Sequence, residues 1–293
     1  MLVSIGLGAA FLWLPRRYAP VLPMLVALGF LATWLPVELW THSFPRLSRS
    51  AYAQGIAAQK SWIDRAVGQN AHVAVLWSGG NRYAVWQNEF WNRSIDRVYG
   101  FGEAMTGGLP SVAVSVDLQD RSTGILRDRH GHPLADRYVL TSTSVQLVGR
   151  KVAADPAKKL VLYEVVPPAR VTTRITGLYP ERANPWSTGR VTWSRAKCRP
   201  GTLTVLVSSD AQLFRGTTQT LTIGGSTPAQ TLHLTPKTSQ RQIVLPLTPQ
   251  NGTCLVTFAI SPTRRPVDVP AMHDSDPRRL GLHFNAIHYT ARP

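Results

Sequence analysis

The longest uninterrupted run of apolar positions lies near the N-terminus. Residues 18–40 read YAPVLPMLVALGFLATWLPVELW and contain a single charged residue. A membrane-spanning helix needs about 20 apolar residues, and Trp34 and Trp40 occupy places typical of an interfacial aromatic belt. Residues 1–14 form a shorter apolar run, which we interpret as a short or truncated helix. The pattern therefore predicts membrane helices within residues 1–41.

The loop between these two runs contains Arg16 and Arg17, in the sequence PRRYAP. Loops rich in Arg and Lys tend to remain on the cytoplasmic side of a membrane. We therefore expect a cell-membrane protein whose residues after about 41 are extracytoplasmic. The alternative is a buried apolar hairpin in a soluble protein.

Helical and strand-like patterns alternate between residues 50 and 167. Apolar positions at helical spacing in residues 51–68 predict a helix that ends at Gly68. The segments HVAVLW, SVAVSVD and LVLYEVV have the length and composition of buried strands, and YVLTSTSVQLVG is rich in β-forming residues. This alternation favours a small α/β domain with several parallel strands.

From residue 168 the pattern changes to short β-rich runs that recur about every 10 residues between turn-forming residues. These runs include RVTTRITGL, GRVTWSR, GTLTVLVSSD, QTLTIGG, RQIVLPLT and CLVTFAIS. Such spacing predicts an antiparallel β-sandwich, jelly-roll-like. The predicted fold class is thus α/β plus all-β behind N-terminal membrane helices, with domains at residues 1–41, 50–167 and 168–293.

The chain contains two cysteines, Cys198 and Cys254, and each opens a strand-like run. An even pair in an oxidising compartment suggests a disulfide. The bond would close a loop of about 55 residues and contribute about 4 kcal/mol in the chain-entropy model. Two buried free thiols are the alternative.

The charge balance is strongly basic. The 293 residues include 32 Lys and Arg against 16 Asp and Glu, a formal net charge of +16. Such a chain attracts polyanions, among them anionic glycans and phospholipid headgroups. The arginines are scattered and form no Lys/Arg block, so we expect no nucleic-acid partner.

Neither of two short motifs supports a cofactor or metal. The SGG turn at residues 78–80 follows a predicted strand but lacks both GxGxxG and the Walker lysine, which favours a plain turn. Asp128, His130 and His132 could bind zinc, but they lie in a predicted hairpin turn with no further ligand cluster in view. We therefore expect no cofactor and no metal.

Two pairs of acidic residues are candidates for hydrolytic chemistry. Glu89 with Asp96, or Glu103 with Asp117, could supply the two carboxylates of a glycoside hydrolase. Asp96 has arginines on either side in sequence, which favours ion pairing over a perturbed acid. No serine lies in a GxSxG motif. A glycoside hydrolase is kept as an alternative function, and no catalytic residue is assigned.

Aromatic residues gather between residues 77 and 101 and again at the start of the predicted sandwich. Exposed aromatic faces surrounded by polar side chains hold sugar rings by stacking and hydrogen bonding. Packing between the two domains is the alternative. The candidate glycan-binding residues are Trp77, Trp86, Trp91, Arg93, Asp96, Trp186 and Trp193.

Five stretches occur in a set order: SWIDRAVGQNAHVAVLW, NEFWNRSIDRVYGF, TGLYPERANPWSTGRVTW, CRPGTLTVLVSSDAQLF and DPRRLGLHFNAIHY. Together they resemble the C-terminal exported region, with the last membrane helices, of bacterial polytopic GT-C-type glycosyltransferases that use lipid-linked sugars. The resemblance covers nearly the whole chain. It implies three partners: the membrane, a cell-envelope glycan or lipid-linked sugar acceptor, and the catalytic membrane domain of a glycosyltransferase.

GT-C enzymes place their catalytic carboxylate in the first exported loop of a many-helix membrane domain. This chain has no such loop, so no catalytic residue carries over. Its start within an apolar run fits a C-terminal fragment or a separately encoded tail. The resemblance therefore implies a non-catalytic, membrane-anchored accessory region that handles glycan or acceptor. A free-standing envelope structural or adhesion module that binds anionic polymer is the alternative.

Overall fold

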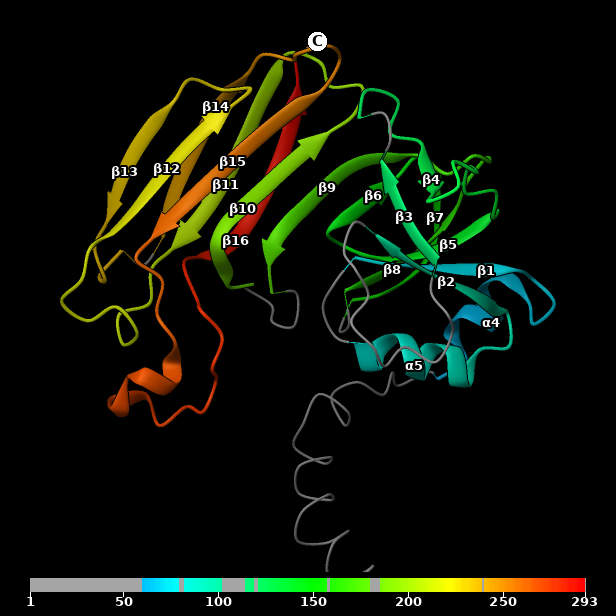
Figure 1. The fold of residues 1–293 in the computed structure, drawn as a ribbon, viewed down its shortest axis with the longest axis horizontal. Coiled ribbons are helices and arrows are strands. Elements are labelled where there is room, and N and C mark those ends of the chain that lie inside the picture. The colour runs from blue at the N-terminus through cyan, green and yellow to red at the C-terminus, as the bar shows by residue number, and fades with distance from the viewer. Residues whose placement is uncertain are drawn as a thin grey trace, which may run out of the picture. The chain divides into compact units, whose positions relative to one another are not determined.

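In the part of the chain that the computed structural model describes, most of the secondary structure is strand, and the strands form three sheets (Figure 1). Residues from 57 onward form one compact unit. The structure describes residues 60–78, 82–101, 114–118, 121–156, 159–179, 185–238 and 240–292.

The first sheet has seven strands in the order β4-β3-β2-β1-β5-β8-β7. Its middle strands β3, β2, β1 and β5 run parallel, whereas β4, β8 and β7 are antiparallel to their neighbours. Two short helices accompany it. The bounds are α4 (Trp62–Val67), β1 (Val73–Trp77), α5 (Arg82–Trp91), β2 (Ile95–Phe101), β3 (Val114–Leu118), β4 (Leu126–Asp128), β5 (Tyr138–Ser142), β7 (Arg150–Asp155) and β8 (Leu160–Glu164).

The two helices are fastened to each other by buried polar side chains. Asn92, just after α5, accepts the backbone N–H groups of Ile63 and Asp64 at 3.0 and 3.1 Å. The Asp64 carboxylate in turn accepts the backbone N–H groups of Arg93 and Ser94, each at 3.0 Å. N–H groups at the start of a helix have no intrahelical partner. Asn92 therefore satisfies those of α4, and Asp64 holds the chain where it leaves α5.

The other two sheets pack face to face as a β-sandwich. A six-stranded sheet, β13-β12-β15-β10-β9-β6, lies against a three-stranded sheet, β14-β11-β16, and buried residues of both form one core. Neighbouring strands in both sheets are antiparallel. The bounds are β6 (Val145–Leu147), β9 (Val171–Leu178), β10 (Ser187–Arg195), β11 (Gly201–Ser208), β12 (Gln219–Gly225), β13 (Gln230–Leu234), β14 (Arg241–Leu247), β15 (Cys254–Ser261) and β16 (His283–Ala291).

The predicted disulfide is confirmed. Cys198 and Cys254 are bonded, with their Cα atoms 5.6 Å apart. Cys198 precedes β11 in the three-stranded sheet, and Cys254 begins β15 in the six-stranded sheet. The bond therefore links the two layers of the sandwich.

The fold class predicted from the sequence is wrong, although the sandwich within it is present. The described part is mostly β. In the first sheet, β4, β7 and β8 are antiparallel to their neighbours, so they need no helical connection. Antiparallel neighbours need only a short turn between them, whereas parallel neighbours need a long crossover that is usually helical. The membrane helices predicted within residues 1–41 lie outside the described residues. In the described part, no helix has the length and apolar character needed to cross a membrane.

Short strand β6 connects the sequence of the first sheet to the sandwich. It follows β5 after two residues, yet it pairs with β9 of the six-stranded sheet. A segment that precedes residue 167 thus belongs to a sheet formed mostly by later residues. The domain limits at residues 50–167 and 168–293 stay a prediction.

Candidate functional site

A groove with a volume of about 380 Å³ lies on the outer face of the six-stranded sheet, beside the end of β3. Ligand pockets in proteins usually measure about 300–1,000 Å³. Its lining is mainly hydroxyl-bearing and basic. The lining residues are Asp117, Arg121, Val171, Thr172, Arg174, Thr176, Arg190, Thr192, Ser194, Arg195, Ala196, Thr253, Leu255 and Thr257.

The floor of the groove is formed by alternate residues of three adjacent strands. Thr192 of β10 pairs with Thr176 of β9 on one side and with Thr257 of β15 on the other. Alternate residues of a strand point to opposite faces, so the next residue along β10, Trp193, is buried in the sandwich core. The same alternation that fills the core therefore arranges hydroxyl groups in a row across the outer face.

Arg190 lies on this face too, because it is two residues before Thr192 on β10 and the pairing of β10 with β15 is regular between them. The pairing of β10 with β9 shifts register between Ser187 and Thr192, where Gly177 is the one intervening residue on β9. Gly177 has a φ of +82°, and a Cβ atom there would collide with the carbonyl oxygen of Arg190. The Thr188 hydroxyl donates to that same carbonyl at 2.8 Å. These contacts hold the backbone of Arg190 while its side chain is exposed.

A turn that follows β3 supplies the opposite wall of the groove. It contains Arg121, which is exposed. The chain just after this turn is hydrogen-bonded to the segment leading into β9: Val171 N donates to Gly124 O at 2.7 Å, and Leu126 N donates to Ala169 O at 3.1 Å. The turn is therefore tied to the same strand that forms the floor.

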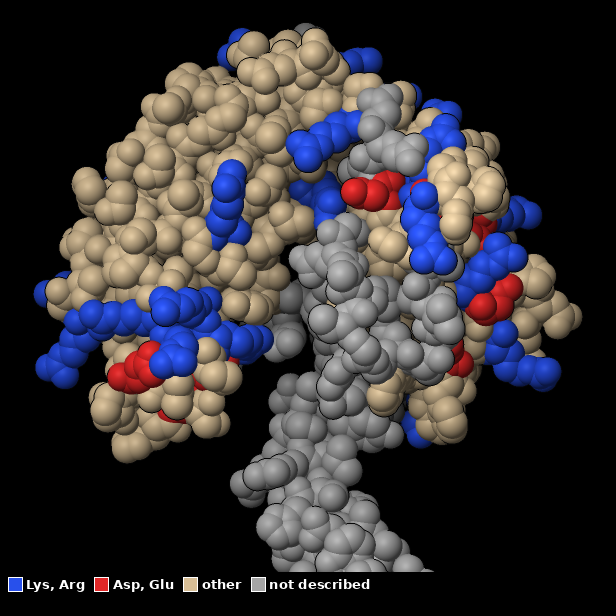
Figure 2. All heavy atoms as spheres, in the orientation of Figure 1, with Lys and Arg blue, Asp and Glu red and all other residues tan. Residues whose placement is uncertain are grey.

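Two of the groove's four arginines are positioned by contacts with the protein. Arg174 donates to the carbonyl oxygen of Phe101 at 3.2 Å, and its guanidinium lies 3.9 Å from the centroid of that ring. Arg195 donates to the Thr173 hydroxyl at 2.8 Å and lies 4.6 Å from the centre of the Tyr289 ring. Figure 2 shows Lys and Arg side chains on this face of the molecule.

The structure does not bring the predicted glycan-binding residues together into one site. Trp86 and Trp91 lie on α5 with 38% and 40% of their surface exposed, and the Lys60 ammonium lies 4.3 Å from the centre of the Trp91 ring. Trp77, at the end of β1, is half-buried. None of the three lines the groove.

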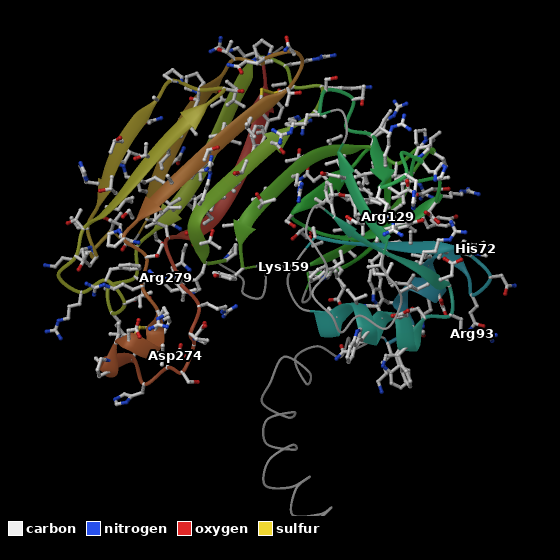
Figure 3. The ribbon with its side chains drawn as sticks, in the orientation of Figure 1. His72, Arg93, Arg129, Lys159, Asp274 and Arg279 are labelled. Carbon is white, nitrogen blue, oxygen red and sulfur yellow. A yellow bond between two sulfur atoms is a disulfide. The ribbon has the colours of Figure 1, made fainter. Side chains whose placement is uncertain are left out.

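The two predicted polar residues also lie with the seven-stranded sheet. Arg93 is exposed. Asp96 is bound to His72, with 2.6 Å between its Oδ2 and the imidazole Nδ1. Figure 3 shows His72 and Arg93 near α4 and β1, and not on the sheet that carries the groove. Glycan binding by Trp77, Trp86, Trp91, Arg93 and Asp96 stays a prediction.

The two remaining tryptophans require a correction. Trp186 and Trp193 are only 4% and 2% exposed. Trp186 stacks on His283 with ring centroids 3.6 Å apart, and Trp193 belongs to the sandwich core. Their rings are covered by protein and do not present a face for a sugar, because Trp193 points inward from β10 and Trp186, just before that strand, packs on His283.

The residues considered for zinc binding form an exposed, hydrogen-bonded turn. Asp128 accepts the backbone N–H groups of His130 and His132, both at 2.8 Å, which closes an exposed turn. No group of three metal-ligating side chains is found in the described part of the chain. Asp117 lines the groove, whereas Glu103, its proposed partner, lies outside the described residues.

Sequence reasoning missed the groove residues because it followed the aromatics. The signal was the polar half of the strand pattern. In VTTRITGL and RVTWSR the alternate positions are Thr172, Arg174 and Thr176, then Arg190, Thr192 and Ser194. An outward face made of hydroxyls and arginines on two neighbouring strands marks a polar binding surface. The pattern does not reveal which strands are neighbours.

No protein-family model and no curated protein matches the chain. Among solved structures, the chain is similar to the CBM51-2 and INT domains of Clostridium perfringens ZmpB, with 6% identity and a TM-score of 0.22 over 50% of this chain and 29% of that one. It is also similar to BtGH115A, a family GH115 4-O-methyl-alpha-glucuronidase, with 12% identity and a TM-score of 0.27 over 72% and 23% of the two chains.

A third similarity is to carbohydrate-binding modules from the beta-sandwich superfamily, with 10% identity and a TM-score of 0.20 over 57% of this chain and 71% of that one. The matches to the first two proteins span less than a third of their length. With TM-scores this low, the likeness establishes neither a common fold nor a common function.

Proposed function

We propose that this protein is a non-catalytic polysaccharide-binding module that holds a glycan chain in the groove of its β-sandwich. The observation that carries the proposal is the hydroxyl row formed by Thr176, Thr192 and Thr257. Neighbouring strands lie about 4.8 Å apart, so three such positions span about 10 Å. A sugar chain lying across the strands would meet a hydrogen-bonding group at each of them.

The chemistry of the lining suits a polyhydroxylated ligand. A Thr or Ser hydroxyl can both donate and accept a hydrogen bond, as a sugar hydroxyl can, while arginine supplies donors in a fixed fork. The floor combines these groups with the aliphatic side chain of Leu255, which offers apolar contact to a sugar ring.

The lining supports binding over hydrolysis. Most glycoside hydrolases need a pair of carboxylates on either side of the scissile bond. Among the described residues that line the groove, Asp117 is the single acid. We therefore place the chain with binding modules, and we propose that it serves a cell-envelope glycosyltransferase by holding the acceptor glycan, as the resemblance of the five sequence stretches implies.

We further propose that the module works outside the cytoplasm. Disulfides persist in secreted and extracytoplasmic proteins and are rare in the reducing cytosol. The Cys198–Cys254 bond supports that placement, and extracytoplasmic polysaccharides would be available to the groove there.

The test is binding of the full chain to a panel of cell-envelope polysaccharides by isothermal titration calorimetry. Replacing Thr192 and Thr257 together by Val removes two hydroxyls at nearly constant shape. At about 1 kcal/mol for each hydrogen bond, we expect affinity to fall about 30-fold. Thr222→Val is the matched control, because Thr222 is exposed on β12 and does not line the groove.

Two results would contradict the proposal. One is the absence of binding to every polysaccharide of the panel; the other is an equal loss of affinity in the control variant. Release of reducing sugar by the purified chain would contradict the non-catalytic assignment specifically.

A further inference from the structure

We propose that the groove selects acidic glycans, meaning chains that carry carboxylate or phosphate groups, through Arg190 and Arg121. This inference rests on the proposed function and adds the class of ligand. It starts from the charge of the lining, where four arginines face one aspartate. A concave surface lined by one sign of charge raises the local concentration of ligands of the opposite sign.

The four arginines divide into two kinds. Arg174 and Arg195 are half-buried and are engaged with Phe101 and with Thr173, as described above. Arg121 and Arg190 are exposed, and their side chains have no ion pair or hydrogen bond with any residue that the structure describes. The first pair supplies fixed positive charge, and the second pair is available to bind a ligand.

The available arginines come from separate elements. Arg190 lies at the irregularity of β10, where Gly177 and the Thr188 hydroxyl hold its backbone. Arg121 lies in the turn after β3. A guanidinium binds a carboxylate or a phosphate through two parallel hydrogen bonds. Two such groups on different walls fit a polymer whose anionic groups repeat along the chain.

Positive charge is unevenly distributed over the strands of this sheet. Strands β9 and β10 contain Arg174, Arg190 and Arg195, whereas β12, β13 and β15 contain no Lys or Arg. Those three strands instead present threonines, such as Thr222 and Thr257. The arginines of this sheet are therefore concentrated on β9 and β10, two of the three strands that form the floor of the groove.

The experiment compares three polymers with one backbone: dextran, carboxymethyl-dextran and phosphate-substituted dextran. Affinities are measured with the full chain at physiological salt, where long-range attraction between exposed charges is largely screened. We expect both charged polymers to bind at least tenfold more tightly than dextran. A preference for one of them identifies carboxylate or phosphate as the favoured group.

Variants test whether the groove is responsible. Hydrogen bonds to charged groups contribute about 1.5–3 kcal/mol, so Arg190→Gln and Arg121→Gln should each weaken binding of the charged polymers by about 10-fold to 100-fold, and binding of dextran by much less. Arg190→Lys keeps the charge but loses the fork, and should give an intermediate loss. Arg241→Gln is the matched control. It removes the same positive charge, but Arg241 is exposed on β14 of the other sheet.

The outcomes separate the two proposals. Equal affinity for dextran and its charged forms would overturn the selectivity and leave the proposed function standing. Equal losses in Arg190→Gln and Arg241→Gln would also overturn it, because the attraction would then come from overall charge. If no glycan binds at all, here or in the polysaccharide panel, the proposed function itself fails.

Discussion

At the scale of single residues, the groove depends on a glycine with no functional group. Gly177 combines a positive φ with close approach to the carbonyl oxygen of Arg190. Glycine adopts positive φ at little cost, whereas a side chain there is strained and would also displace the neighbouring strand. Gly177 thus permits the close approach of β9 to the backbone of Arg190, while alternation along β10 places the Arg190 side chain on the outer face.

Gly177→Ala should lower the free energy of unfolding by more than about 1 kcal/mol, because strain at positive φ is joined by a backbone collision. It should also weaken binding of the charged polymers. Urea unfolding measures the first effect and calorimetry the second. Gly216→Ala is the control: Gly216 has a φ of +71° but open space around it. Equal destabilisation by both substitutions would show that the close approach is unimportant.

At the scale of elements, one carboxylate of β8 forms ion pairs with β7 and with the residue just before β5. Glu164 of β8 accepts from Arg137, which precedes β5, and from Arg150 of β7, both at 2.6 Å. The hydrogen bonds from these two guanidinium groups lower the pKa of Glu164 below its ordinary value of 4.5. The antiparallel edge of the sheet is therefore stabilised by an ion pair on either side of β8.

Glu164→Gln should destabilise the protein at neutral pH. A carboxylate whose pKa is lower in the folded state stabilises that state above its unfolded pKa, and this contribution disappears as pH falls through the lowered folded pKa. The stability difference between wild type and variant should therefore shrink on acidification, as measured by urea unfolding from pH 7 to pH 3. In an Arg137→Gln, Arg150→Gln background the pH-dependent difference should be smaller. A constant difference across the range would disprove the pairing.

At the scale of the whole molecule, the disulfide holds the two sheets of the sandwich together across a sequence separation of 56 residues. Closing a loop of this length stabilises a protein by about 4 kcal/mol in the chain-entropy model. Replacing both Cys198 and Cys254 by Ala should lower the free energy of unfolding by about this amount. Adding a thiol reductant to the wild type should give a similar loss, and should leave the double variant unchanged. If the bond of the wild type is reduced and its free energy of unfolding does not change, the estimate is contradicted.

Much of the sandwich could be predicted from the sequence. The runs that form β9 to β16 alternate apolar and polar residues, and an alternating run marks which side chains are buried whatever strand lies beside it. Cys254 begins β15 as its local pattern predicts, whereas Cys198 lies three residues before β11. The helix end at Gly68 was also predicted, and it is the C-cap of α4.

The candidate site could not be predicted in the same way. Alternation assigns a residue to a face but does not identify the neighbouring strand, so nothing local indicated that Thr176, Thr192 and Thr257 form one row. Aromatic residues were ambiguous for a related reason. Trp193 and Trp91 have similar polar neighbours in sequence, yet one is 2% exposed and the other 40%.

The sequence by itself determined the positions of most sandwich strands and the strongly basic charge, because each depends on local pattern or on composition, and it suggested the disulfide that the structure shows. Only the tertiary structure decided that β6 joins the sandwich, that the first sheet has antiparallel edges, and that Arg190 meets the turn containing Arg121 at one groove. These features depend on pairing between segments distant in sequence, which is set by the packing of the whole chain.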